Sequence, residues 1–229
     1  MNKRNIVLLS IGFLGLFLFI LMYILVLNAS EPLTIDYAVR DFCYSIRGEK
    51  YNFCYWFFRI ITEFGYLYFV VALGIIAIFL FRLDNRFFIY VFILVLATAL
   101  QIAIKDNVSR TRPIEAMRWV SESSTSFPSG HSMTSGVISS YFIFLIWESK
   151  HKKRDKGICI SIISVIYLLV IISRLILGVH YFSDVIAGVS LGIFMGIIGI
   201  FIYLLFDKLE ILNTPLIFKD KDNWVLWRE

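Results

Sequence analysis

The chain has 229 residues, of which 59% are hydrophobic and only 17% are charged, and its formal net charge is +5. This composition is too apolar for an ordinary soluble domain and indicates an integral membrane protein. Basic residues beside membrane spans account for the positive charge, so the charge does not require a nucleic-acid partner. We expect an all-α bundle that forms a single membrane-embedded domain over residues 1–229.

Six apolar runs predict six transmembrane helices, because most of them approach the roughly 20 residues that a spanning helix needs. The runs are Ile6–Leu27, Phe64–Phe81, Phe87–Ile104, Ser132–Trp147, Gly157–Ile172 and Val185–Phe206. Lys3 and Arg4 precede the first run as they would in a signal peptide. That run is too long for a signal peptide and lacks a small-residue cleavage site, so we expect a retained helix.

The loop between the fourth and fifth runs indicates which side of the membrane is cytoplasmic. It carries five basic residues, Lys150, Lys152, Lys153, Arg154 and Lys156. Basic loops stay in the cytoplasm, and an even number of spans puts both termini on that same side. The segments after the first, third and fifth runs are then extracytoplasmic. A short chain with one such domain is typical of a bacterial plasma membrane protein.

The first outer segment, residues 28–63, mixes basic and aromatic side chains and is predicted to lie along the membrane surface. It either guides a lipid headgroup or only anchors the fold. Cys43 and Cys54 lie in this segment, where an oxidising compartment would permit a disulfide, and two unpaired thiols are the alternative. Asn28 and Asn107 begin glycosylation-type triplets that we interpret as chance matches.

Ionisable residues gather at the outer ends of the spans in three short blocks. The blocks are KDNVSRTRP at 105–113, PSGH at 128–131 and SRLILGVHYFSD at 173–184. A charged side chain costs roughly 2.5 kcal/mol or more at the bilayer centre, so these blocks indicate a functional site. Arg110 and Arg118 lie in the loop that follows the third apolar run, and we interpret them as solvated or headgroup-facing charges.

The third block combines a histidine with a carboxylate. His180 and Asp184 are four residues apart and share one face of the helix that opens the last span. A carboxylate beside an imidazole fixes its tautomer and stabilises its charged form, as a histidine that attacks phosphorus requires. Standing alone, the pair would be more typical of a structural contact. Gly178 is expected to end the preceding helix, so that Ser173 and Arg174 face the same pocket.

The second block has the composition of an anion site at a helix start. Pro128, Ser129 and Gly130 immediately precede the fourth run, where free backbone N–H groups and the helix dipole favour a phosphate. His131 titrates near neutral pH and suits an acid that protonates a leaving alcohol. A helix cap followed by an interfacial histidine is the alternative for this block.

Three cations complete the predicted site. Lys105 and Arg112 from the first block, together with Arg174, could surround one phosphate without help from a metal. Carboxylates near the blocks, at Asp106, Glu115, Glu122 and Asp184, show no recognised metal spacing. We therefore expect neither a metal nor a cofactor.

In order and spacing, the three blocks resemble the motif of the type 2 phosphatidic acid phosphatase (lipid phosphate phosphatase) family, written K-x6-RP, PSGH and SR-x5-H-x3-D. Every fixed position is present, and agreement at about a dozen residues is far more specific than one short motif. Phe182 is a departure, because many bacterial members have proline there. Six spans also fit the family.

This resemblance implies a role for each matching residue. His180 would be the nucleophile that becomes phosphohistidine, Asp184 would orient it, and His131 would be the general acid. Phosphate would be bound by Lys105, Arg112, Ser129, Gly130 and Arg174, while Pro113, Pro128 and Ser173 would support the pocket.

The resemblance also implies an enzyme that hydrolyses the terminal phosphate of a membrane lipid at the outer face. Relatives act on phosphatidic acid, phosphatidylglycerophosphate, diacylglycerol pyrophosphate or polyprenyl pyrophosphates, so the lipid stays open. A lipid phosphotransferase, a vanadate-dependent haloperoxidase and a non-catalytic lipid-phosphate binder or transporter are the alternatives. The expected partners are the bilayer and the lipid substrate, with no nucleic acid and no obligate protein partner.

Overall fold

A computed structural model describes residues 2–66, 68–72, 85–149 and 151–209. The α-helices are α1 (Lys3–Leu27), α2 (Thr34–Arg47), α3 (Phe53–Ile61), α5 (Asn85–Val108), α6 (Gly130–Glu148), α7 (Lys153–Ile176) and α8 (Phe182–Lys208). Two 3-10 turns are η1 (Thr62–Gly65) and η2 (Glu115–Met117). Over these described ranges the regular secondary structure is entirely helical, which confirms the predicted all-α class.

Four of the described helices, α1, α5, α7 and α8, are long and apolar enough to cross a membrane. They correspond to the predicted first, third, fifth and sixth spans. The shorter α6 covers the fourth predicted span, but its first turns carry the small and polar residues GHSMTSG. The second predicted span, Phe64–Phe81, lies partly outside the described residues, so six spans stay a prediction.

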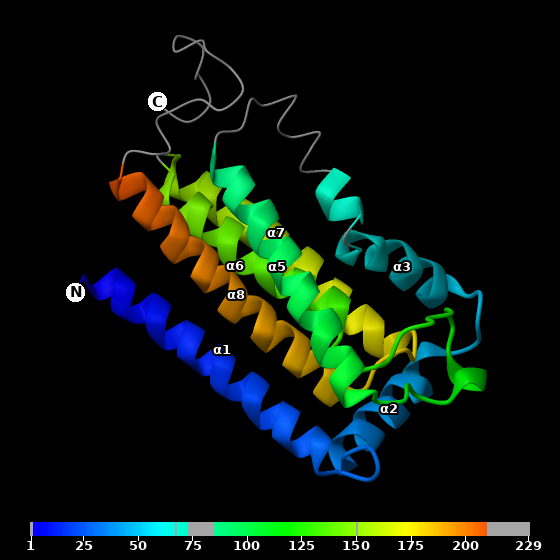
Figure 1. Ribbon diagram of the computed structural model, residues 1–229. Helices are drawn as coiled ribbons and strands as arrows, with labels where there is room; N and C mark the ends of the chain where they lie inside the picture. The colour runs from blue at the N-terminus through cyan, green and yellow to red at the C-terminus, as the bar shows by residue number, and fades with distance from the viewer. Residues whose placement is uncertain (1, 67, 73–84, 150, 210–229) are drawn as a thin grey trace.

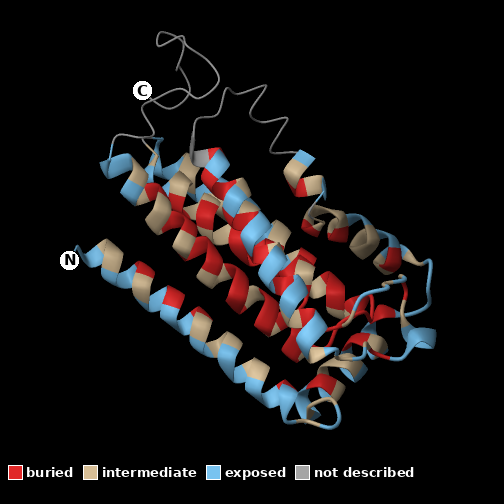
Figure 2. Ribbon diagram, viewed as in Figure 1, coloured by how far each residue is buried: buried red, intermediate tan, exposed pale blue. Residues whose placement is uncertain are grey.

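The central helix of the bundle is α8, which packs against α1, α5 and α6. Its apolar stretch is 61% buried, whereas that of α1 is 17% buried. Figure 1 shows α1 running along one side of α8. Figure 2 shows that most of the surface of α1 is exposed. Apolar side chains on such a surface are expected of a helix that faces lipid.

Glycines allow α6 and α8 to approach closely. A Cβ added at Gly192 would overlap the backbone carbonyl oxygen of Met133, and one at Gly136 would lie 2.6 Å from that of Val189. Small residues permit such backbone contact in membrane bundles. The contact brings the start of α6 against the start of α8, where the Ser129 amide donates to the Asp184 carbonyl at 3.0 Å.

Replacing Gly192 with alanine is expected to lower the free energy of unfolding by about 1–3 kcal/mol, because the new methyl group must push the two helices apart. Thermal unfolding of the purified protein in detergent measures this loss. Gly157→Ala on α7 is the matched control, since its Cβ would meet nothing within 4 Å. Equal melting temperatures for the two variants would contradict a tight α6–α8 contact.

The two ends of the bundle differ in character. Arg4 and Glu148 form an ion pair of 2.6 Å, so the start of α1 and the end of α6 lie at the same end. The opposite end carries α2, α3 and the loop between α5 and α6 (Figure 1). The start of α1 and the end of α6 thus lie at one end of the bundle, and the side of the membrane that this end faces stays a prediction.

The predicted surface segment forms α2 and α3, which together expose a row of large apolar side chains. These are Ile35, Phe42, Ile46, Phe53, Trp56 and Ile60. On α2 two charged residues, Asp36 and Arg47, are buried instead. An outward apolar face with polar groups held against the bundle is typical of a segment in contact with a membrane surface. Cys43 and Cys54 are free thiols.

Candidate active site

The three motif blocks meet at the α2 end of the bundle. Arg112, on the loop after α5, has its Nη1 atom 3.1 Å from Nε2 of His180, which lies between α7 and α8. Lys105 at the end of α5 donates to the carbonyl of Thr125. The predicted site residues Lys105, Ser129, His131, Ser173, Arg174, His180 and Asp184 are all buried. The structure therefore gathers residues that are far apart in the chain.

The contact with Arg112 determines the tautomer of His180. A guanidinium can only donate hydrogen bonds, so Nε2 of His180 accepts and carries the free lone pair. The proton of the neutral ring is then on Nδ1, which lies 3.7 Å from Oδ2 of Asp184. That separation is too long for a hydrogen bond. Nε2 is thus the nucleophilic atom, and it points toward the cations.

Burial lowers the pKa of His180 well below its ordinary value, and the charges of Arg112, Arg174 and Lys105 lower it further. The ring is consequently neutral near pH 7. Burial also lowers the pKa of Arg112, to about 10, so this guanidinium stays charged at the same pH. A neutral imidazole beside fixed cations combines an available lone pair with an anion site.

Arg174 and Arg112 share one carboxylate. Arg174 is fully buried, donates to Thr62 Oγ1 at 2.7 Å and pairs with Glu122. Arg112 Nη2 lies 3.8 Å from the same carboxylate. Arg174 Nε has no hydrogen-bond partner among the described residues. A phosphate in this site would meet an unused donor on Arg174 and would compete with Glu122 for the two guanidinium groups.

The start of α6 lies beside these cations. The ring of His131 packs on Tyr66 with centroids 4.2 Å apart, and its buried Nε2 has no hydrogen-bond partner among the described residues. Ser129 caps α6, because its Oγ accepts from the Ser132 amide at 3.4 Å and from the Ser132 hydroxyl at 2.9 Å. Gly130, the first residue of α6, follows this cap.

The predicted supporting residues make backbone contacts. The Pro128 carbonyl accepts from Gln101 Nε2 at 3.2 Å, and the Pro113 carbonyl accepts from Arg118 Nε at 2.7 Å. The Ser173 hydroxyl donates to the Val170 carbonyl of its own helix at 2.6 Å. Arg118 is therefore half-buried and bonded to the loop rather than fully solvated, and the headgroup-facing alternative for it stays a prediction.

The interpretation of Arg110 as a solvated or headgroup-facing charge is wrong. Its side chain is only 10% exposed and forms ion pairs with Asp184 and with Asp36 of α2. Asp184 also accepts from the Ser126 hydroxyl at 2.5 Å and from the Tyr181 amide at 2.8 Å. The carboxylate beside His180 is thus held by three other groups.

Comparison with known proteins identifies the family of this chain. Residues 86–209, more than half of the chain, match the PAP2 superfamily, and this stretch contains all three motif blocks. The chain belongs to the PAP2 superfamily. Phosphatidylglycerophosphatase B of Bacillus subtilis (strain 168) is 43% identical to this PAP2 protein over 97 residues, which are 40% of this chain and 45% of that protein. The aligned stretch thus spans less than half of that curated relative.

Two solved structures resemble most of this chain in fold. The crystal structure of a transmembrane PAP2-type phosphatidylglycerolphosphate phosphatase from Bacillus subtilis has a TM-score of 0.71 and 27% identity, and the match covers 86% of this chain and 96% of that chain. LpxE from Aquifex aeolicus has a TM-score of 0.61 and 21% identity, with 75% and 98% covered. At that identity the second match shows the fold alone.

Sequence reasoning did not assign to the site four residues that contact its candidate residues. These are Asp36, Gln101, Glu122 and Ser126. Asp36 lies outside the stretch that matches the family, and its partners in the site, Arg110 and Ser183, are more than 70 residues away. Glu122 and Ser126 lie in an irregular loop without periodicity. The spacing of Asp36 and Arg47, three helical turns apart on one face of α2, is the signal that could have found Asp36.

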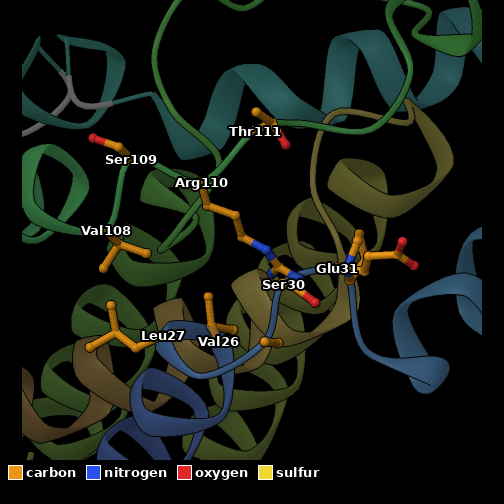
Figure 3. Close-up of a pocket in the computed structure, with 10 residues that line it drawn as sticks. Val26, Leu27, Ser30, Glu31, Val108, Ser109, Arg110 and Thr111 are labelled. Carbon is orange, nitrogen blue, oxygen red and sulfur yellow. The ribbon is translucent and has the colours of Figure 1, made fainter.

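A pocket of about 290 Å³ opens between the end of α1 and the loop after α5 (Figure 3). Ten residues line it: Val26, Leu27, Ala29, Ser30, Glu31, Pro32, Val108, Ser109, Arg110 and Thr111. His180 and the phosphate-binding candidates are absent from this lining. The pocket therefore meets the candidate site through Arg110, which forms the ion pair with Asp184.

Proposed function

We propose that this PAP2 protein is a metal-independent lipid phosphate phosphatase that forms a phosphohistidine on His180. One observation carries the proposal: the neutral, buried His180 directs its Nε2 lone pair at Arg112, within the field of Arg174 and Lys105. A phosphate bound by these cations has its phosphorus next to the lone pair. Phosphoryl transfer needs this combination of a positioned nucleophile and neutralised equatorial oxygens.

In the first step, Nε2 of His180 forms a bond to phosphorus while the bond from phosphorus to the lipid oxygen breaks. The leaving oxygen takes a proton from His131, so the lipid departs as an alcohol. In the second step a water molecule gives a proton to His131 and attacks the phosphorus. The P–N bond breaks, inorganic phosphate leaves, and both histidines return to their initial states.

Phosphatidylglycerophosphate is the substrate that we test first, because the curated relative and the 27%-identical structure are both named for its hydrolysis. Phosphatidic acid and undecaprenyl pyrophosphate carry the same terminal phosphate group and are the next candidates. We further propose that the site faces the extracytoplasmic side of a bacterial plasma membrane and that both termini are cytoplasmic.

The decisive experiment measures inorganic phosphate released from the three lipids by purified protein in detergent, with EDTA present. Release from phosphatidylglycerophosphate faster than from the other two lipids is expected. A folded protein that releases phosphate from none of them, or that needs an added divalent metal, would contradict the proposal. Release only when a lipid alcohol acceptor is added would identify a phosphotransferase instead.

The pH dependence tests the state of His180. The neutral ring is the reactive form, so the acid limb of kcat/KM is expected below pH 6.5, the ordinary histidine value. Arg112→Gln removes a cation 3.1 Å from Nε2, which favours the protonated ring and raises the pKa of His180. The acid limb should therefore move to higher pH by about one unit.

Arg112→Lys is the matched control for this shift, because it keeps the charge and should leave the acid limb near its original position. Using one lipid throughout removes the contribution of substrate ionisation from the comparison. An acid limb that does not move in Arg112→Gln would show that a group other than His180 controls it.

A further inference from the structure

Behind His180, three charged residues from separate parts of the chain form a buried chain of ion pairs. Arg110 Nη2 lies 2.8 Å from Oδ2 of Asp36, and Arg110 Nη1 pairs with Oδ1 of Asp184. Both carboxylates are fully buried. Ser183 bridges the Asp36–Arg110 pair: its hydroxyl donates to Asp36 at 2.8 Å and accepts from Arg110 at 2.8 Å.

Asp184 has three hydrogen-bond partners in this part of the site besides its neighbour His180. Arg110 occupies Oδ1, while the Ser126 hydroxyl and the Tyr181 amide occupy Oδ2, at 2.5 and 2.8 Å. The remaining neighbour of Oδ2 is Nδ1 of His180, at 3.7 Å. The surrounding groups therefore decide whether this gap can close when the ring becomes positively charged.

We propose that Asp36 and Arg110 are positioning residues, which hold Asp184 and through it set the orientation and charge of His180. The proposal rests on the function proposed above, and it adds two residues that the PAP2 motif does not include. Arg110 connects the two carboxylates, and its guanidinium lies 4.7 Å from the ring centroid of Tyr181, next to His180. Asp36 also accepts from the Ser183 amide at 2.8 Å, which fixes the first turn of α8.

The charges make the proposal testable, because two carboxylates share a single guanidinium. By formal charge the cluster is negative, and it favours a proton on His180 against the nearby cations. Removing Arg110 makes the cluster more negative, whereas neutralising Asp36 makes it less negative. The two changes should therefore move the titration of His180 in opposite directions.

A control variant on α2 tests whether Asp36 acts only by holding this helix in place. Asp36 could act only by anchoring α2 to the bundle, but Arg47, three turns further along, anchors α2 as well. Arg47 donates to the carbonyls of Ile176 and Met117, at 3.0 and 2.7 Å, and does not contact Asp184. Arg47→Gln thus loosens α2 without changing the charge around Asp184.

Nuclear magnetic resonance of the histidine rings supplies a readout that does not depend on turnover. The chain has only three histidines, so ¹⁵N-histidine labelling of the full-length protein in detergent gives few signals, and His180→Ala assigns the one of interest. The charged groups that face His180 are Arg112 from the loop, Lys105 from α5, His131 from α6, Arg174 from α7 and Asp184 from α8. All of them are unchanged in the Asp36 and Arg110 variants.

We expect the titration midpoint of His180 to rise in Arg110→Gln and to fall in Asp36→Asn, by about half a pH unit or more in each case. Arg110→Lys and Arg47→Gln should leave the midpoint within a smaller range. Unchanged midpoints in both Asp36→Asn and Arg110→Gln, or equal shifts in Arg47→Gln, would overturn the proposal.

Steady-state kinetics provide a second test of the positioning role. In Asp36→Asn and Arg110→Gln, kcat should fall about 10-fold or more while KM changes less than about 3-fold, because substrate contacts are intact and the nucleophile is misplaced. Arg110→Lys should recover part of kcat. Arg47→Gln should lower the melting temperature and keep kcat. If Asp36→Asn does not fold, Ser183→Ala keeps every charge and should lower kcat about 3-fold; an unchanged kcat would count against the cluster.

The two proposals fail in different ways. If the parent protein releases no phosphate from any lipid tested, the proposed function fails, and the titration of His180 still decides whether Asp36 and Arg110 control this ring. If the parent protein is active and the midpoint and kcat are indifferent to both substitutions, the positioning role alone is refuted.

Discussion

Replacing His180 with alanine is expected to lower the rate of phosphate release by at least about 10⁴-fold, since no bond from the protein to phosphorus can then form. The parent protein, mixed briefly with a lipid labelled in its terminal phosphate and quenched in alkali, should retain label that is lost on mild acid treatment. His180→Ala should retain none. Rapid-quench assays and the labelled protein band measure both effects.

His151→Ala is the matched control for this experiment. His151 lies in the basic loop between α6 and α7. This loop follows Glu148, which pairs with Arg4 at the end of the bundle away from the candidate site. Replacement of His151 should leave both the rate and the label unchanged. Turnover in His180→Ala above a tenth of the parental rate, or label on the His180→Ala protein, would assign the nucleophile to another residue.

Much of the candidate site can be predicted from short motifs in the sequence. PSGH at a helix start is readable without a structure, because caps and turns are local features. The prediction that His180 and Asp184 share one face of a helix is wrong, because α8 begins at Phe182 and His180 precedes its N-cap residue Tyr181. The four-residue spacing still brings the two side chains to 3.7 Å. The helices begin earlier than the apolar runs predict. Residue Phe182 starts α8 rather than Val185, since Asp184 accepts from the Tyr181 amide and extends the first turn.

Sequence reasoning could not identify the long-range partners of the charged residues. Arg110 reads as a solvated charge because its loop is polar, yet Asp36 and Asp184 are 74 residues away on either side. Burial of such a charge depends on tertiary packing that no window of the sequence contains. The same holds for Glu122, whose role between Arg174 and Arg112 is visible only when α7 and the outer loop are folded together.

The second large effect is expected at Arg174. Arg174→Met should lower kcat/KM by about 10³-fold, because the phosphate loses a fully buried donor and its charge. The same change leaves Glu122 without its closest partner and should lower the free energy of unfolding by about 3 kcal/mol. Phosphate-release kinetics and denaturation in detergent measure the two losses separately.

Glu122→Gln, combined with Arg174→Met, distinguishes the role of Arg174 in catalysis from its role in stability. With the carboxylate neutralised, the unpaired charge disappears, and most of the lost stability should return while activity does not. Recovery of activity in the double variant would mean that Arg174 serves only to neutralise Glu122. Continued loss of activity in a restored fold would identify Arg174 as a ligand of the phosphate, which is the role that its unused Nε donor supports.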